Sequence, residues 1–245
     1  MNKDSLKFVI TRDGSPTIYD PVFKEHHHSL IGAYTEARHK FAEVARPLLS
    51  KKERIKLLDL PFGMGYNLIA SAQLLEELNG GAYLYCVAIE KDPKIIEAIS
   101  LCPFGQQLQR YFDQIKTLSI NETQAQGGNF QVRLIVDDLL HTLKELDEAF
   151  DLIYYDPFSP RVAPELWSKD KVLFHLARLM SDEALLITYT ASNKVRKALL
   201  ELGLYIAPGP AVGRKMGGTM ASKRPIEGQS FSVEILNKIA KATPY

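Results

Sequence analysis

The chain has few of the residues on which disulfide scaffolds, metal clusters and membrane spans depend. Its 245 residues include two cysteines, Cys86 and Cys102, which are too few for a disulfide framework or a metal-binding quartet. No apolar run approaches the length of a membrane span. The first residues lead into no apolar signal segment. We therefore expect a cytoplasmic protein that has no membrane or metal partner.

A charge excess and internal repeats are also absent from the sequence. The formal net charge is +1, so any contact with nucleic acid has to come from a local basic patch. The hydrophobic share of 46% is ordinary for a globular protein with a sizeable core. At this length we expect one large domain, with or without a small decoration.

From residue 33 onwards, apolar strand patterns alternate with helical patterns. Such alternation is typical of an α/β fold whose mostly parallel, doubly wound sheet carries helices on both faces. A final, half-exposed strand at residues 229–236 is expected to run antiparallel, and residues 124–129 are expected to form a polar loop. The expected strands are residues 55–60, 82–89, 131–136, 150–155 and 184–189, and the expected helices are residues 33–49, 66–78, 93–101, 104–118, 164–180 and 194–202.

The N-terminal region has a turn signal of its own. Asp13-Gly14 stands between two short extended segments, residues 7–12 and 16–19, and this arrangement favours a β-hairpin. We expect residues 1–32 to form a β-hairpin extension and a lid. Residues 33–245 are expected to form the α/β domain.

Acidic residues follow the expected parallel strands, at the sheet edge where ligands bind in such folds. Glu90 is placed to accept hydrogen bonds from two ribose hydroxyls, and Asp137 and Asp138 lie where an adenine amino group would be. Asp59, or a nearby carbonyl, could hold an ammonium group. Together these acids suit S-adenosylmethionine, whose sulfonium and ammonium groups are both positive. For any single acid, a strand-end cap or a solvated turn is the alternative.

Two glycines follow the first of these strands. Gly63 and Gly65 allow the backbone to approach a ligand closely. Ile69 occupies the position of the third glycine of the dinucleotide fingerprint, so a pyrophosphate cradle is disfavoured. Amides at the start of the next helix could instead hold an amino-acid carboxylate. The pattern therefore favours S-adenosylmethionine over a dinucleotide.

The tripeptide Asp156-Pro157-Phe158 ends the apolar run at residues 150–155. Enzymes that methylate amino groups on planar bases need a carboxylate that orients the amine and a ring that stacks on the base. Asp156 is placed to contact the methyl donor, bind the amine and help its deprotonation. Pro157 would fix the turn and Phe158 would stack on the base. An ordinary Asp-Pro turn and a core-facing ring are the alternatives.

Several segments of the chain together form a recognisable pattern: residues 19–29 with Gly32, Ala33 and Glu36, then residues 62–67, 156–160, 164–167, 188–190 and 213–215. In these segments the sequence resembles the MnmC-type methyltransferases, and among them the stand-alone MnmD-like form. The resemblance implies a Rossmann-like class I fold that uses S-adenosylmethionine to methylate the aminomethyl group of the wobble uridine, 2-thiolated or not, in the tRNA anticodon region.

The chain departs from this family in two respects. Met64 stands between the motif glycines, where the family commonly has a small residue, and Pro61 stiffens the preceding turn. The bifunctional members also carry a flavin-dependent oxidase domain, for which this chain has no second glycine motif. A separate enzyme is then expected to supply the aminomethyluridine.

Further residues of the matching segments are candidates for binding. Phe62 and Asn67 flank the motif glycines and are expected beside the cofactor, and His28 is expected to contact it from the lid. Glu36 is expected near substrate or cofactor, and Tyr189 is expected to wall the base pocket. Arg214 and Lys215 belong to a basic stretch with Lys223 and Arg224 that would contact phosphates near the active edge. The alternatives are an ordinary surface histidine run for His28 and a solvated helix position for Glu36. For Tyr189 the alternative is simple packing, and for the basic stretch it is a solvated loop.

Other functions are compatible with the same pattern. An aminopropyl transferase also pairs this fold with an aspartate at a strand end, although it usually has a denser glycine motif. Another amine or a DNA base could be the methyl acceptor. A non-enzymatic RNA-binding module of the same fold is the remaining alternative.

Overall fold

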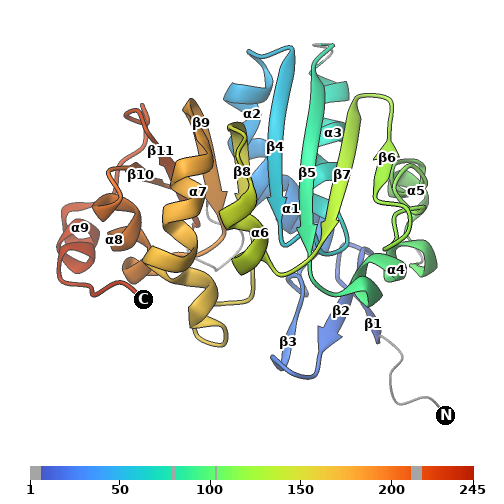
Figure 1. Ribbon diagram of the computed structural model, residues 1–245, viewed down its shortest axis with the longest axis horizontal. Helices are drawn as coiled ribbons and strands as arrows, with labels where there is room; N and C mark the ends of the chain where they lie inside the picture. The colour runs from blue at the N-terminus through green and yellow to red at the C-terminus, as the bar shows by residue number, and fades with distance from the viewer. Residues whose placement is uncertain (1–6, 79–80, 103, 211–216) are drawn as a thin grey trace.

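The computed structural model describes residues 7–78, 81–102, 104–210 and 217–245, and its centre is an eight-stranded sheet (Figure 1). The strand order is β10-β11-β9-β8-β4-β5-β7-β6. The bounds are β4 (Arg54–Leu60), β5 (Tyr83–Glu90), β6 (Gln124–Gln126), β7 (Phe130–Val136), β8 (Phe150–Tyr155), β9 (Met180–Thr188), β10 (Tyr205–Pro208) and β11 (Thr219–Ser222). The five strands from β9 to β7 run parallel, which confirms the mostly parallel sheet.

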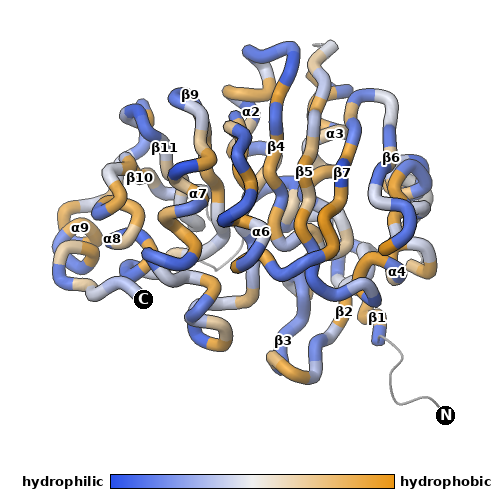
Figure 2. Tube along the Cα trace, in the orientation of Figure 1, coloured by the Kyte–Doolittle hydropathy of each residue, from blue (hydrophilic) through white to orange (hydrophobic). Residues whose placement is uncertain are grey.

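Helices cover both faces of this sheet (Figure 1). Successive strand residues point to opposite faces, so Leu57 packs in one core and Leu58 in the other. Strand β5 is hydrophobic over most of its length because both of its faces are covered (Figure 2). The first core contains α1 (Ala33–Ala37), the π-helical turn η1 (Arg38–Ala42), α2 (Glu43–Leu49), α3 (Tyr66–Glu77), α4 (Pro93–Leu101) and α5 (Gln106–Phe112), and the second contains α6 (Leu139–Glu145), the turns η2 (Pro164–Trp167) and η3 (Lys169–Leu173), α7 (Phe174–Leu179) and α8 (Asn193–Glu201).

The strand order reverses between β4 and β8. Strands β5 and β7 lie on one side of β4, and β8 and β9 lie on the other. Leu60 and Tyr155 are partners in the ladder, so the segments that follow them leave the sheet side by side. The Asp156 amide donates to the Leu60 carbonyl at 2.9 Å. A crevice outside the strand ends at such a reversal is where open α/β sheets bind ligands.

A second, three-stranded sheet formed by β1 (Phe8–Ile10), β2 (Pro16–Asp20) and β3 (Glu25–His26) lies beyond this end of the main sheet (Figure 1). Its first two strands confirm the expected hairpin, with Gly14 at φ +83° in the turn. The third strand was not predicted from the sequence. The Tyr66 hydroxyl fastens this small sheet to α3 by donating to the Pro16 carbonyl at 2.7 Å. The division at residue 32 itself stays a prediction.

The expected final strand at residues 229–236 is wrong, because α9 (Val233–Ala240) occupies this region. Ser232 caps the helix by accepting from the Ile235 amide. Phe231 and Ile239 are buried and Ile235 is half-buried, which is the four-residue spacing of one helix face. The antiparallel strands near the C-terminus are β10 and β11 instead.

Three other expectations differ from the structure. In place of the expected helix at 164–180, residues 164–179 contain η2, η3 and α7 and Met180 begins β9, and only residues 106–112 of the expected helix 104–118 are helical. The expected loop at 124–129 contains β6, which pairs with β7 at the sheet edge. Helix α6, capped by Asp138, was not predicted.

None of the helices in the described part of the chain has the length and apolar character to cross a bilayer.

Candidate active site

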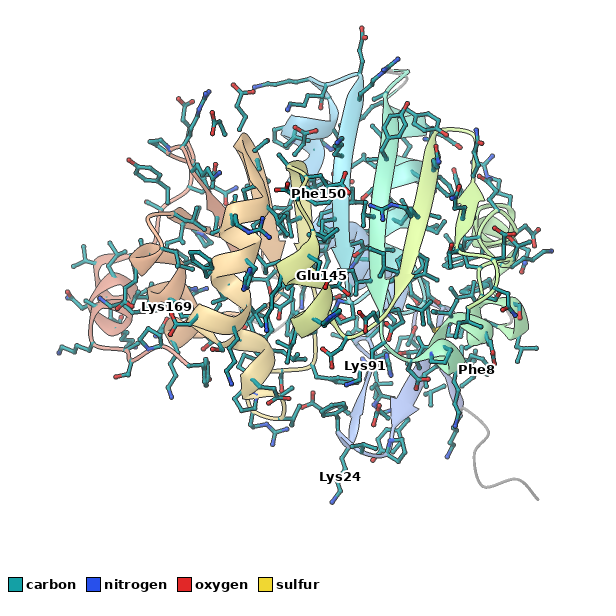
Figure 3. The ribbon with its side chains drawn as sticks, viewed as in Figure 1. Phe8, Lys24, Lys91, Glu145, Phe150 and Lys169 are labelled. Carbon is teal, nitrogen blue, oxygen red and sulfur yellow. The ribbon has the colours of Figure 1, made fainter. Side chains whose placement is uncertain are left out.

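A cleft of about 1190 Å³ lies between the small N-terminal sheet and the strand ends of the main sheet. Segments that follow β4, β5, β7 and β8 line it from one side, and residues 20 and 23–31 line it from the other. Figure 3 places Lys91 at this end of the sheet and Lys24 at the outer tip of the small sheet. Among the described lining residues, nine carry carboxylates and two are lysines. This excess of negative charge favours a cationic ligand.

Glu90 lies at the floor of the cleft, where β5 ends. It is 7% exposed, and its Oε1 accepts from the Lys91 and Asp92 amides while Oε2 accepts from the Gly63 amide at 2.9 Å. Burial raises the pKa of Glu90, although these amides oppose the rise. The three amides therefore hold the carboxylate in a fixed position where it lines the cleft.

Asp156 lines the cleft at the point where β8 ends. Its Oδ2 lies 3.5 Å from Asn67 Nδ2, a long hydrogen bond. Burial, and then the negative charge of Glu36, raise the pKa of Asp156 well above its usual range, while the Lys40 charge opposes the rise. A carboxylate with a raised pKa is a better proton acceptor than an exposed one, which suits the predicted role of Asp156.

Lys40, which the sequence analysis missed, is 5% exposed behind this carboxylate. Its Nζ donates to Glu36 Oε1 at 2.7 Å and lies 5.7 Å from the centre of the Tyr189 ring. Glu36 Oε2 accepts from the Ser29 amide at 2.7 Å. Burial alone would raise the pKa of Glu36, but Lys40 and the Ser29 amide lower it overall. Glu36 thus remains a fixed negative charge at the cleft wall.

The backbone of the Asp156-Pro157-Phe158 loop is held by two aromatic donors. The Tyr189 hydroxyl donates to the Pro157 carbonyl at 2.9 Å. Trp167 Nε1 donates to the Phe158 carbonyl at 2.9 Å, and the Trp167 ring is fully buried. Tyr189 and Trp167 therefore position the loop, in addition to packing.

Phe158 is partly exposed and lines the cleft, so it is not a core-facing ring. Its ring stacks on Phe23 of the N-terminal segment, with centroids 4.2 Å apart and planes inclined by 26°. His27 meets the Phe158 ring edge-on at 5.1 Å. The predicted stacking surface is therefore present, but another aromatic ring lies against it.

Asp59 differs in position from the other acids at the strand ends. It is completely buried and does not line the cleft. Its Oδ1 lies 3.4 Å from Asn67 Nδ2, and its Oδ2 has no hydrogen-bond partner among the described residues. Burial raises the pKa of Asp59 to about 8. The structure therefore does not support the predicted direct contact between Asp59 and a ligand ammonium. Asn67 lies between Asp59 and Asp156, and of these two acids Asp156 lines the cleft.

Some residues of the turn after β4 line the cleft, and others do not. Phe62, Gly63 and Asn67 line the cleft, whereas Gly65 does not. Gly63 has φ +56° and open space where a Cβ would stand, which leaves room for a ligand. Gly65 has φ +78°, and a Cβ there would lie 2.8 Å from Ile115 Cδ1.

Replacing Gly65 by alanine is expected to lower the free energy of unfolding by about 1–3 kcal/mol, because the new methyl group adds a clash to backbone strain. Gly228→Ala is the matched control, since Gly228 has φ +75° with no atom within 4 Å of the Cβ position. Denaturant unfolding of both variants measures the difference. Equal losses of stability would contradict the predicted clash at Gly65.

The acids after β7 are more exposed. Asp138 caps α6 by accepting from the Leu140 amide, and its Oδ2 pairs with Lys91 Nζ at 2.7 Å. Asp137 Oδ2 lies 2.8 Å from His141 Nδ1. Both acids line the cleft, where the sequence predicted an adenine amino group, although each already has a structural partner.

His28 lines the cleft next to α3, as a lid residue would. Its Nδ1 lies 3.1 Å from Thr17 Oγ1, and its ring meets Tyr66 edge-on at 4.9 Å. Burial lowers the pKa of His28 to about 4, so the ring is neutral.

Within residues 7–78, 81–102, 104–210 and 217–245, no cluster of three or more His, Cys, Asp or Glu side chains is suited to a metal ion.

The structure describes one part of the predicted phosphate-binding stretch. Arg214 and Lys215 lie outside the described residues. For Lys223 and Arg224 the expected position near the active edge is wrong, because β11 runs antiparallel to β9 and carries them to the opposite end of the sheet. Lys223 Nζ donates to the Met180 carbonyl, and Arg224 pairs with Glu183 at 2.7 Å.

The groups of this cleft fit S-adenosylmethionine. The carboxylates match its two positive charges. Glu90 can accept from ribose hydroxyls. The open side of Gly63 allows a ligand to approach the backbone.

Comparison with known proteins agrees with this fit. Residues 102–224, half of the chain, match the model of an S-adenosyl-L-methionine-dependent methyltransferase family. The crystal structure of MnmC2 from Aquifex aeolicus superposes with a TM-score of 0.81 at 25% identity, over 99% of this chain and 80% of that one.

Two curated relatives are similar over most of the chain. The tRNA 5-methylaminomethyl-2-thiouridine biosynthesis bifunctional protein MnmC of Cupriavidus necator is 28% identical over 89% of this chain, which spans 34% of that protein. An uncharacterized protein of Methanocaldococcus jannaschii is 28% identical over 91% of this chain, which spans 61% of its length. The chain therefore belongs to the S-adenosyl-L-methionine-dependent methyltransferases, within the MnmC-like methyltransferase-domain family.

Proposed function

We propose that this methyltransferase methylates the primary amine of 5-aminomethyluridine, with or without 2-thiolation, at the wobble position of tRNA. The observation that carries the proposal is the placement of Asp156 and Glu36 on the wall of the cleft, with the Phe158 ring two residues beyond Asp156. Two carboxylates suit an amine that arrives as an ammonium ion, and the ring suits a planar base. The Cupriavidus necator relative, which is named for the biosynthesis of tRNA 5-methylaminomethyl-2-thiouridine, supports the same substrate class.

The proposed reaction requires the protein to bind an amine and to remove a proton from it. S-adenosylmethionine, when bound, supplies a methyl group on a positively charged sulfur. An ammonium nitrogen has no lone pair, so Asp156 accepts a hydrogen bond from the substrate nitrogen and takes its proton. Glu36, fixed by Lys40 and the Ser29 amide, stabilises the positive amine beside it. Since most of the rate comes from alignment, the rigid backbone of the Asp156 loop is part of the mechanism.

The reaction places requirements on other molecules. The aminomethyl group has to exist before methylation, so a separate activity must supply it. The substrate base lies in the anticodon loop of a tRNA, and Arg214 and Lys215 are proposed to contact its phosphates. Phosphate contacts of this kind weaken as the salt concentration rises.

Transfer of a labelled methyl group to tRNA tests this function. The chain is incubated with S-adenosylmethionine labelled on the methyl group and with tRNA whose wobble uridine carries the unmethylated aminomethyl group. Nucleoside analysis is expected to find the label in 5-methylaminomethyluridine or its 2-thio form. Label in DNA, a polyamine or another small amine, and none in tRNA, would contradict the proposal.

Replacing Lys40 by methionine is expected to move the acidic limb of the pH–rate profile to higher pH. The Lys40 charge opposes the rise in the pKa of Asp156 that burial and Glu36 cause, so its loss makes Asp156 harder to ionise. The ionised carboxylate is the form that accepts the proton. Rates across a pH series measure the shift, and Lys40→Arg, which keeps the charge, should retain the original limb. An unmoved limb in Lys40→Met would contradict this role.

A further inference from the structure

The N-terminal segment of residues 20–31, called the lid here, is joined to the Asp156 loop by side chains. Phe23 stacks on Phe158, and His27 meets the same ring edge-on. Glu25 Oε1 accepts from Ser159 Oγ at 3.1 Å and from Arg161 Nη2 at 3.0 Å. These contacts connect two segments more than a hundred residues apart in the sequence and close one side of the cleft.

The contacts at this junction are of a kind that separates easily. The Arg161 side chain is 81% exposed, and an exposed ion pair contributes little. The neighbouring Val22 is also 81% exposed, and β3 pairs with β2 over two residues only. By contrast, the far end of the lid is held by the Ser29 amide bond to Glu36 and by the Thr17 bonds to His28. The lid is therefore held more firmly at its base than at its outer part.

The Phe23–Phe158 stack occupies the place that a substrate base needs. At a centroid separation of 4.2 Å the two rings are in direct contact, and no planar group fits between them. Yet Phe158 follows Asp156 by two residues, so a base stacked on it would bring its substituent toward the carboxylate. Enzymes that act on an extruded base commonly hold it between aromatic or apolar side chains.

An unsatisfied polar atom lies at the same junction. His27 Nε2 is buried without a hydrogen-bond partner among the described residues, and the nearest acid, Asp20, is 4.0 Å away. Its ring borders Phe158, so a base stacked there would bring polar edge groups close to it. A buried polar atom without a partner is rare unless a ligand or water completes it.

We propose that Phe23 is a substrate-binding residue: the lid lifts, the wobble base enters between Phe23 and Phe158, and the two rings then hold it from both faces. This inference rests on the proposed function, because it requires a planar base as substrate. When the lid is closed without substrate, the Phe23 and Phe158 rings stack on each other in the positions where each would otherwise contact the base. The exchange replaces one ring–ring contact by two base–ring contacts, and Asp156 and Glu36, which lie outside the lid, stay in place on the cleft wall.

Kinetics of Phe23 variants with the aminomethyl tRNA test the inference. Phe23→Ala is expected to lower kcat/KM for tRNA by at least about tenfold, because one stacking surface is lost. Phe23→Tyr should retain most of the activity, and Val22→Ala, an exposed neighbour without a ring contact, should behave like the unaltered chain. The affinity for S-adenosylmethionine, measured by calorimetry without tRNA, should stay within a few-fold in all three variants.

A fluorescence measurement adds a readout that a merely structural role would not change. In Phe23→Trp, stacking of the bound aminomethyl tRNA is expected to quench the fluorescence more than in the unaltered chain, in which Trp167, bonded to the Phe158 carbonyl, is the only tryptophan. Unquenched fluorescence, or full activity of Phe23→Ala, would overturn the inference and leave the proposed function standing. Failure of the unaltered chain to methylate the tRNA would remove both.

Discussion

Asparagine in place of Asp156 is expected to lower the rate of methyl transfer by about 10²–10⁴-fold, which is the usual contribution of a positioned proton acceptor. The amide has nearly the same shape as the carboxylate, so the loop and the cleft should be retained. It cannot take a proton from the substrate ammonium, and it removes one negative charge next to the amine. Single-turnover rates with saturating S-adenosylmethionine and tRNA measure this loss.

The control for this variant is Asp147→Asn, an identical change at a fully exposed aspartate before β8, at the opposite end of the sheet. This control should retain its activity. The affinity of Asp156→Asn for S-adenosylmethionine should change less than its rate, because the main expected donor contacts are with Glu90 and the turn after β4. An Asp156→Asn chain with nearly unaltered single-turnover rates would exclude Asp156 as the proton acceptor.

Removal of the Glu90 side chain is expected to have the second large effect, on binding of the donor. Glu90→Ala deletes the carboxylate that is proposed to accept from two ribose hydroxyls and leaves the Gly63, Lys91 and Asp92 amides without their partner. A hydrogen bond to a charged group contributes about 1.5–3 kcal/mol, so losing two should raise the Kd for S-adenosylmethionine by about 10²–10⁴-fold. Calorimetric titration measures this change.

Two further variants make the Glu90 prediction specific. Glu90→Gln keeps one acceptor oxygen and should fall between the unaltered chain and Glu90→Ala. Glu97→Ala removes an exposed carboxylate from α4, the helix that follows, and should bind the donor normally. Thermal unfolding of each variant separates loss of binding from loss of folding. A Glu90→Ala chain that folds and binds the donor with unaltered Kd would contradict the predicted site.

The sequence pattern predicted the parts of the site that follow directly from strand order. Glu90 and Asp156 end buried parallel strands, and parallel strands bring their carboxyl ends to one edge of the sheet. Asp59 does not line the cleft, because it pairs with Ala88 and Tyr154 in the sheet and therefore lies two residues before the level of Glu90 and Asp156. Position at a strand end therefore does not determine whether a side chain reaches the ligand.

Contacts between distant segments could not be predicted from the sequence. Lys40 lies in a segment expected to be an ordinary helix, and its role depends on Asp156 and Tyr189, which directly follow β8 and β9. The stack of Phe23 on Phe158 depends on how the small sheet sits on the main sheet, which no local pattern specifies. In the region of α9, the apolar residues were compatible with both strand and helix spacing, and Ser232 as a helix cap was the overlooked signal.

The cleft at the ends of β4, β5, β7 and β8 is proposed to hold S-adenosylmethionine with its transferable methyl group facing an amine at Asp156. The most direct measurement is a crystal structure of the chain with the donor bound. We expect the ribose on Glu90 and the sulfonium methyl group pointing toward the Asp156 carboxylate. A donor bound elsewhere, or bound in this cleft with its methyl group directed away from Asp156, would contradict the claim.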